Sequence, residues 1–135
     1  MTDDEKALVL ASMEAIEGDP TAAVYARLFA THPEMEALFV MDSAGAVRGH
    51  MLQEAFQSLL DLVGAGQYGV HMIQAELRTH DGIGVPPKVF ATFYPIVRDT
   101  LRDKAGAAWT AQTDAAWEVL LGEIIARIEA VAVPA

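Results

Sequence analysis

The sequence predicts an all-α protein with about six or seven helices. Hydrophobic residues make up 53% of the 135 residues, and many are alanine, leucine or methionine, which form helices readily. Long segments carry apolar residues at the 3.6-residue spacing of a helix face, with glycine and proline between them. Runs of β-branched residues are scarce. A chain of this length suits one hydrophobic core, so we expect a single domain over residues 1–135.

A short polar break separates the first two predicted helices. The first spans residues 2–17, because Thr2 can cap it, acids fill its first turn and Gly18 follows it. Asp19 and Pro20 open the second helix as a cap followed by proline at the first helical position. The apolar face of the second helix consists of Val24, Tyr25, Leu28 and Phe29.

The clearest helix of the sequence covers residues 46–63. A short helix over residues 33–39 and a loop over residues 41–45 lead to it, and a glycine-rich turn at residues 64–69 follows it. Its apolar stripe consists of Val47, Met51, Leu52, Ala55, Phe56, Leu59, Leu60 and Val63.

Three further helices fill the second half of the chain. They span residues 70–80, 87–104 and 110–131, and a break rich in glycine and proline separates the first two of them. Pro95 lies inside the helix over residues 87–104, and we expect it to bend that helix. We expect the tail from residue 132 to be frayed.

The charge and the composition exclude several classes of partner. The net charge of −10 and the isoelectric point near 4.6 argue against nucleic acid, which needs a basic surface, and against anionic membranes. The lack of cysteine excludes disulfides, thiolate haem ligation and iron–sulfur clusters. The first residues do not resemble a signal peptide, and no apolar stretch reaches membrane-spanning length. We therefore expect a cytoplasmic protein.

Familiar catalytic motifs are missing from the sequence. There is no HExxH zinc motif, no GxSxG nucleophile motif and no glycine-rich phosphate loop. The remaining candidates for chemistry are the four histidines, His32, His50, His71 and His80. We interpret His32 and His71 as surface residues.

His80 is the candidate functional histidine. It ends a predicted helix whose apolar face includes Ile73 and Leu77, and the helix after the break carries Phe90 and Phe93 on one face. An imidazole beside such an apolar surface suits a flat apolar cofactor held by one neutral histidine. The alternative is a protonated histidine that only complements the dipole of its helix.

Three groups of residues resemble the bacterial single-domain haemoglobins and the globin domains of flavohaemoglobins. Residues 28–39, LFATHPEMEALF, are similar to their B–C region. Thr79-His80 with Gly84-Val85 is similar to their proximal segment, and Ala116-Trp117 is similar to the tryptophan of their last helix. The ordered set covers about residues 3–130 at matching spacing. The resemblance implies a globin fold, in which the helices surround a haem pocket.

The resemblance also implies roles for individual residues and a cofactor, haem b (iron protoporphyrin IX). His80 matches the proximal iron ligand, and Phe39 matches the phenylalanine that stacks on the haem. Tyr25 matches the tyrosine that points at bound ligand, and Val85 matches the apolar residue under the porphyrin. Phe90 falls where that group usually has a tyrosine, which puts in doubt the proximal hydrogen-bond network of that group.

On the distal side, the resemblance makes Met51 and Leu52 the apolar roof of the pocket. The distal glutamine of that group falls at Val47, or at Arg48 if the register shifts by one residue. His50 is a candidate distal ligand, but we interpret it as an exposed residue that flanks the pocket.

The implied function is reversible binding of a diatomic gas, above all oxygen, at a ferrous haem iron held by His80. One alternative is nitric oxide dioxygenation, which we expect to need a separate reductase because 135 residues leave no room for one. The other is a haem-free sensor module with a globin fold. The colour of the purified protein separates the sensor from the other two. The sequence does not specify an oligomeric state.

Overall fold

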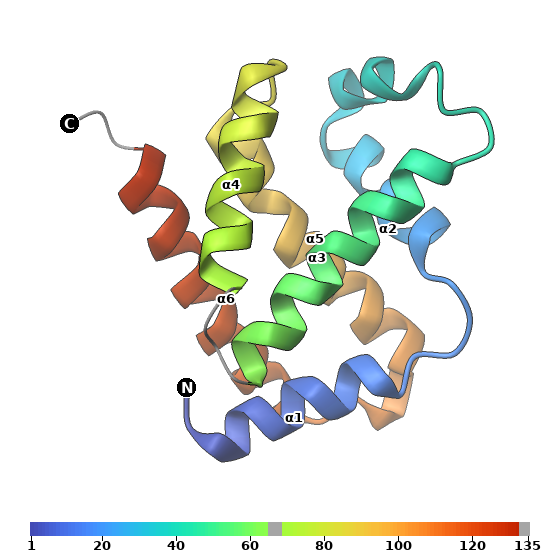
Figure 1. Ribbon diagram of the computed structural model, residues 1–135. Helices are drawn as coiled ribbons and strands as arrows, with labels where there is room; N and C mark the ends of the chain where they lie inside the picture. The colour runs from blue at the N-terminus through green and yellow to red at the C-terminus, as the bar shows by residue number, and fades with distance from the viewer. Residues whose placement is uncertain (65–68, 133–135) are drawn as a thin grey trace.

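The computed structural model describes residues 1–64 and 69–132, and all regular structure within them is helical (Figure 1). The elements in chain order are α1 (Asp3–Glu14), α2 (Thr21–Thr31), the 3-10 segment η1 (Pro33–Phe39), α3 (Ala46–Val63), α4 (Gly69–Gly82), α5 (Pro87–Ala105), the 3-10 turn η2 (Gly106–Ala108) and α6 (Ala111–Ala132). The predicted all-α class is confirmed. No helix in these ranges is long and apolar enough to cross a membrane.

The first two helices differ from the prediction at their ends. α1 begins with a capping box, in which the Thr2 hydroxyl accepts from the Glu5 amide and the Glu5 carboxylate accepts from the Thr2 amide. It ends at Glu14 rather than near residue 17. Asp19 caps the start of α2 by accepting the Thr21 amide at 2.9 Å, so Pro20 precedes the helix instead of being its first residue.

α4 continues past His80 to Gly82, so the predicted break begins later than expected. The amides of Ile83 and Val85 both donate to the His80 carbonyl, at 3.1 and 2.9 Å. Gly84 has a φ of +90°, which an L side chain rarely adopts, and this lets the chain reverse directly after the helix. His80 therefore lies in the last turn of a capped helix.

Two predicted segments fall largely or wholly on residues that the structure does not describe. These are the glycine-rich turn, of which only its first and last residues are described, and the tail, of which residues 133–135 lie outside the described ranges. α5 runs without interruption through Pro95. The expected bend at that residue stays a prediction.

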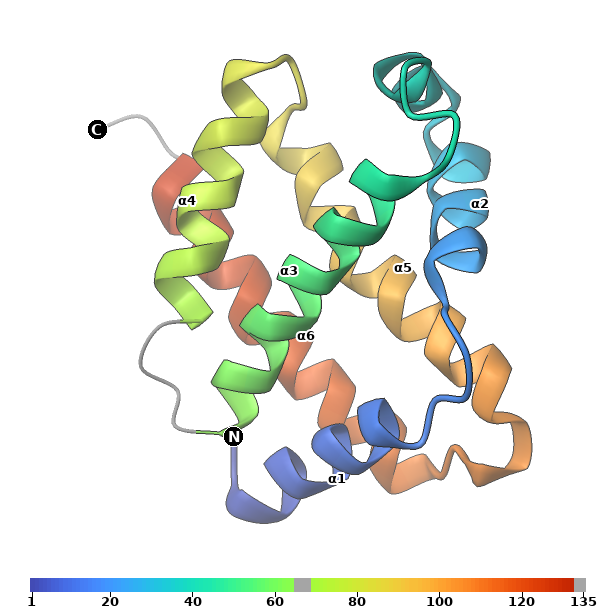
Figure 2. The ribbon, with the colours of Figure 1, turned by 45° about the vertical axis from the view of Figure 1, so that its right-hand side comes forward.

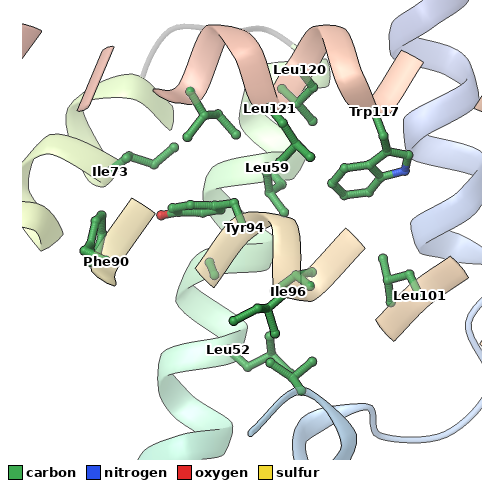
Figure 3. Close-up of a cluster of buried hydrophobic side chains, with 14 of the residues drawn as sticks. Leu52, Leu59, Ile73, Phe90, Tyr94, Ile96, Leu101, Trp117, Leu120 and Leu121 are labelled. Atoms are coloured by element: carbon green, nitrogen blue, oxygen red, sulfur yellow. The ribbon is translucent and has the colours of Figure 1, made fainter. Parts of the chain in front are cut away.

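The helices pack in crossing layers around one core (Figures 1 and 2). α1 lies across the end of the bundle and packs against α6, α3 packs against α4, and α2 packs against α5. Large buried side chains from α3, α4, α5 and α6 meet in the centre, among them Leu59, Ile73, Leu101, Trp117 and Leu120 (Figure 3). This core holds the helices that carry the predicted site residues.

α3 and α4 approach each other closely where α4 begins. A Cβ atom added to Gly69 would lie 2.6 Å from the Ser58 carbonyl oxygen and 2.8 Å from the Leu62 side chain. Only glycine therefore fits at this crossing. This contact positions α4, which carries His80, against α3, which carries Met51.

Candidate functional site

A cavity of about 160 Å³ lies between α2, η1, α3, the end of α4 and the start of α5. Its lining is almost entirely apolar, and Tyr25 and His80 supply its two polar side chains. The structure brings six of the seven predicted cofactor-binding residues to this cavity. They are Tyr25, Phe39, Met51, His80, Val85 and Phe90.

Leu52, the seventh predicted residue, does not line the cavity. Its side chain is 2% exposed and belongs to the central core, where Figure 3 shows it beside Ile96. Successive residues of an α-helix point about 100° apart, so α3 presents Met51 to the cavity and Leu52 to the core. The roof of the cavity on this side consists of Met51 with Val47, one turn earlier.

The His80 side chain is 16% exposed, and one hydrogen bond orients its ring. Its Nδ1 atom lies 2.7 Å from the backbone carbonyl oxygen of Glu76. A carbonyl only accepts, so Nδ1 is the donor of this bond, and in the neutral ring the free lone pair is then at Nε2. The Phe90 ring lies 5.1 Å away, centroid to centroid, and tilts against the imidazole. A ring oriented by a bond at Nδ1 with Nε2 available is the state that an iron ligand requires.

The Tyr25 hydroxyl is the one buried side-chain polar atom in the described part of the chain that lacks a hydrogen-bond partner. The side chain is 2% exposed, and its ring packs against Phe39 and Phe93 at centroid distances of 5.4 and 5.8 Å. Burial raises the pKa of Tyr25 far above its ordinary value, so the phenol is neutral and can donate. An unpaired buried hydroxyl costs about 1–3 kcal/mol, and a ligand that accepts from it would remove that cost.

At the start of α3, Val47 and Arg48, the two candidates for the distal position, lie differently. Val47 lines the cavity, although its side chain is half exposed. Arg48 turns away to Asp42: its Nε donates to the carboxylate at 3.1 Å and its Nη2 donates to the backbone carbonyl at 2.7 Å. The structure therefore presents valine, not arginine, to the cavity on this side.

None of the other three histidines lines this first cavity, although His50 lines a second cavity that adjoins it. His50 is 72% exposed on its side chain and lies 3.6 Å from Glu54, and His71 is exposed, as the sequence indicates for both. His32, interpreted from the sequence as a surface residue, lies at the surface only in part. Its side chain is only 20% exposed, and its Nε2 lies 3.0 Å from the Thr92 hydroxyl, which links the end of α2 to α5.

A second cavity, of about 250 Å³, adjoins the first and shares Met51, His80, Phe90 and Phe93 with it. Its polar lining includes His50, which the sequence offered as a candidate distal ligand, and also Glu76 and Tyr94, which sequence reasoning missed. The spacing offers a signal for Glu76, which precedes His80 by one helical turn and has its carboxylate 3.6 Å from Nδ1. Burial and the charge of Glu76 raise the pKa of Tyr94, so this phenol is also neutral.

The first cavity contains one imidazole, that of His80. Within residues 1–64 and 69–132, no three histidine, aspartate or glutamate side chains gather closely enough to hold a metal ion by themselves. A single histidine beside a wide apolar surface matches the protein's part in haem ligation. The unpaired Tyr25 hydroxyl across the same cavity provides a donor for a ligand. The residues present therefore fit a haem.

Comparison with known proteins places the chain in a family. The globin family model matches residues 22–128, which include every predicted site residue. This chain belongs to the globin family, and its all-helical structure is a globin fold. No curated protein and no solved structure gives a match to it.

Proposed function

We propose that this globin binds haem b through His80 and holds a diatomic gas, above all oxygen, reversibly. One observation carries the proposal: the same apolar cavity contains an imidazole with an available Nε2 and a buried tyrosine hydroxyl without a partner. The first is the protein ligand that a haem iron needs. The second is a neutral donor for a ligand with partial negative charge.

The cavity residues divide into two roles. Haem iron, when bound, supplies the coordination position at which a diatomic gas is held. His80 would hold the cofactor, and Phe39, Val85 and Phe90 would contact its apolar surface. Met51 and Val47 would exclude water from the opposite side, and Tyr25 would donate a hydrogen bond to the gas. Exclusion of water from an apolar site strengthens that hydrogen bond.

The volume of the first cavity indicates that some side chains must move when a cofactor binds. Ligand pockets usually measure roughly 300–1,000 Å³, so the first cavity alone is small for a cofactor. It reaches this range only together with the adjoining cavity, from which it is separated by Met51, Phe93 and their neighbours. We infer that haem binding moves these side chains and joins the two spaces. The haem-free and haem-bound proteins then differ in how these side chains pack.

The experiment is a titration of the purified, haem-free protein with hemin, followed by visible absorption. We expect saturation at one haem per chain, a sharp Soret band and new bands on reduction and on exposure to carbon monoxide. A protein that stays colourless, or that takes up hemin without saturation, would support the haem-free sensor instead.

A further inference from the structure

A separate cavity of about 720 Å³ lies where the start of α1 meets the end of α3, the start of α4 and α6. We call it the α4–α6 cavity. Figures 1 and 2 both show the start of α1 below the first turn of α4. The cavity shares no described residue with the two cavities at His80. Its volume lies within the range of roughly 300–1,000 Å³ that is typical of ligand pockets.

The apolar lining of the α4–α6 cavity continues the central core outward. It combines core residues of α4 and α6 with half-buried residues at the end of α3 and the start of α4, namely Ile73, Leu120, Ile124, Leu62 and Val70. On α6, the small residues Ala126 and Ala130 leave this hydrocarbon surface without a large side chain over it. An alkyl chain in the cavity would therefore remove apolar surface from water.

Three charged side chains belong to the described lining, those of Lys6, Glu123 and Arg127. The Glu123 carboxylate is already paired, because it accepts from the Met1 ammonium at 2.9 Å. The Lys6 ammonium and the Arg127 guanidinium have no hydrogen bond or ion pair with any side chain in residues 1–64 and 69–132. Two cations without a partner therefore lie beside the apolar lining.

The absence of a partner is notable because acidic residues outnumber basic ones by 19 to 9 in this chain. Elsewhere, four arginines pair with carboxylates: Arg27 with Asp103, Arg48 with Asp42, Arg98 with Glu118 and Arg102 with Asp99. Arg78 also lacks a described partner, but it does not line this cavity. A guanidinium and an ammonium next to hydrocarbon are complementary to an anion with an apolar tail.

We propose that the α4–α6 cavity is a binding site for the free anion of a medium-chain fatty acid. The carboxylate pairs with Arg127 and Lys6, and the alkyl chain lies against the apolar lining. This ligand uses both features of the cavity, whereas a small inorganic anion would leave the apolar surface in water. The inference goes beyond the proposed gas binding and does not depend on haem, because the cavities have no described residue in common.

The first test is a titration of the purified full chain with octanoate, followed by methyl NMR. We expect the Ala126 and Ala130 methyl signals to shift, and those of Met51 and Val85 in the candidate haem cavity to stay in place. Affinity should rise about fourfold for each methylene from hexanoate to decanoate. Shifts confined to Met51 and Val85 would overturn the proposal, because octanoate would then occupy the haem cavity. An affinity that is independent of chain length would also overturn it.

The second test compares matched variants for octanoate affinity. Arg127→Gln should weaken binding by up to about tenfold, the size expected for one charge-assisted pair at a partly exposed site. Arg78→Gln makes the same change of charge at an exposed position outside the cavity and should leave binding unchanged. Equal weakening by the two variants would show only an effect of net charge and would contradict the site.

The third test fills the cavity and examines the other source of such a ligand. Ala126→Trp introduces a large ring at an exposed lining position and should lower octanoate affinity by more than tenfold, whereas Ala115→Trp, exposed on the same helix, should not. Vesicles of phosphatidylglycerol should not bind the protein. If the vesicles bind, octanoate does not, and Arg127→Gln releases the vesicles, the surface recognises a membrane and the proposal is wrong.

Discussion

The two sides of the candidate haem cavity are built in different ways. On the side of α4 and α5, the main polar group is His80, and a bond within its own helix, from Nδ1 to the Glu76 carbonyl, orients it. On the side of α2 and α3, the polar group is the Tyr25 hydroxyl, which has no partner in the described residues. Its surroundings come from separate segments, which meet only in the folded protein: Phe39 of η1, Met51 of α3 and Phe93 of α5.

This difference indicates that the two sides of the cavity have separate roles. A histidine oriented by its own helix is ready to bind before any ligand arrives, which is what a permanent cofactor requires. A donor with no partner is incomplete until a ligand comes, which is what reversible gas binding requires. Changes on the first side should therefore affect retention of the cofactor, and changes on the second should affect the gas.

The largest expected effect is that of His80→Ala. Loss of residues that only orient a metal ligand typically lowers metal affinity about 10–100-fold, so loss of the ligand itself should lower haem affinity by more than that. The matched control is His71→Ala on the same helix, which removes an exposed imidazole and should keep the pigment. Hemin transfer to a competing haem-binding protein measures both. Normal haem retention by His80→Ala would mean that another residue is the iron ligand.

The next effect concerns the stability of the whole protein. A ligand that binds only the native state stabilises it by mass action, by about 4 kcal/mol when its free concentration is a thousandfold above its Kd. Chemical denaturation of the haem-free and haem-bound protein should differ by an amount of this order. Hydrogen exchange should show the largest loss of protection on haem removal at α4, which carries His80. Equal denaturation curves for the two forms would contradict this prediction.

Much of the α4–α5 side could be predicted from the sequence, because its information is local. The helix before His80, the break after it and the apolar residues Val85 and Phe90 follow one another within a short stretch, and the structure brings all of them to the cavity. The helix end was placed too early, because the cap formed by the Ile83 and Val85 amides depends on the backbone at Gly84.

The α2–α3 side was harder to predict, because helical periodicity does not show which neighbour each residue of a stripe faces. Met51 and Leu52 both belong to the apolar stripe of α3, but only Met51 faces the cavity. Val47 and Arg48 were both candidates for the distal position, but Arg48 is bonded to Asp42. The contact of His32 with Thr92 depends on the packing of α2 against α5, which no local pattern of the sequence shows.

A smaller and more selective effect is expected for Tyr25→Phe. The change removes one hydrogen-bond donor and keeps the ring contacts with Phe39 and Phe93. One net hydrogen bond contributes roughly 0.5–1.5 kcal/mol, more with a charged acceptor, and 1.4 kcal/mol is tenfold in an equilibrium constant. Oxygen should therefore dissociate about tenfold faster, whereas carbon monoxide, which is a poorer acceptor, should change little. Stopped-flow measurement of both gases provides the test. An unchanged oxygen rate would make Tyr25 a packing residue only.

The smallest expected effect is on the dependence of stability on pH. Burial alone would raise the pKa of Asp42, but the amides of Val47 and Arg48 and the Arg48 side chain outweigh it and lower the pKa. A carboxyl with a lowered pKa stabilises the fold above its unfolded value, about 3.9, and loses this contribution as the pH falls through the folded value. Acid unfolding of Asp42→Asn should therefore show a smaller loss of stability below about pH 4 than the unmodified chain. Parallel curves would show that Asp42 does not hold the start of α3.

Nε2 of His80 is the proposed protein ligand of a haem iron in this cavity. Resonance Raman spectroscopy of the reduced, gas-free holoprotein tests it directly through the iron–histidine stretching band. We expect a band that shifts when the histidines are labelled with ¹⁵N, disappears in His80→Gly and returns when free imidazole is added to that variant. A labelled band that persists in His80→Gly without imidazole would contradict the account, because the iron would then be held by His32, His50 or His71.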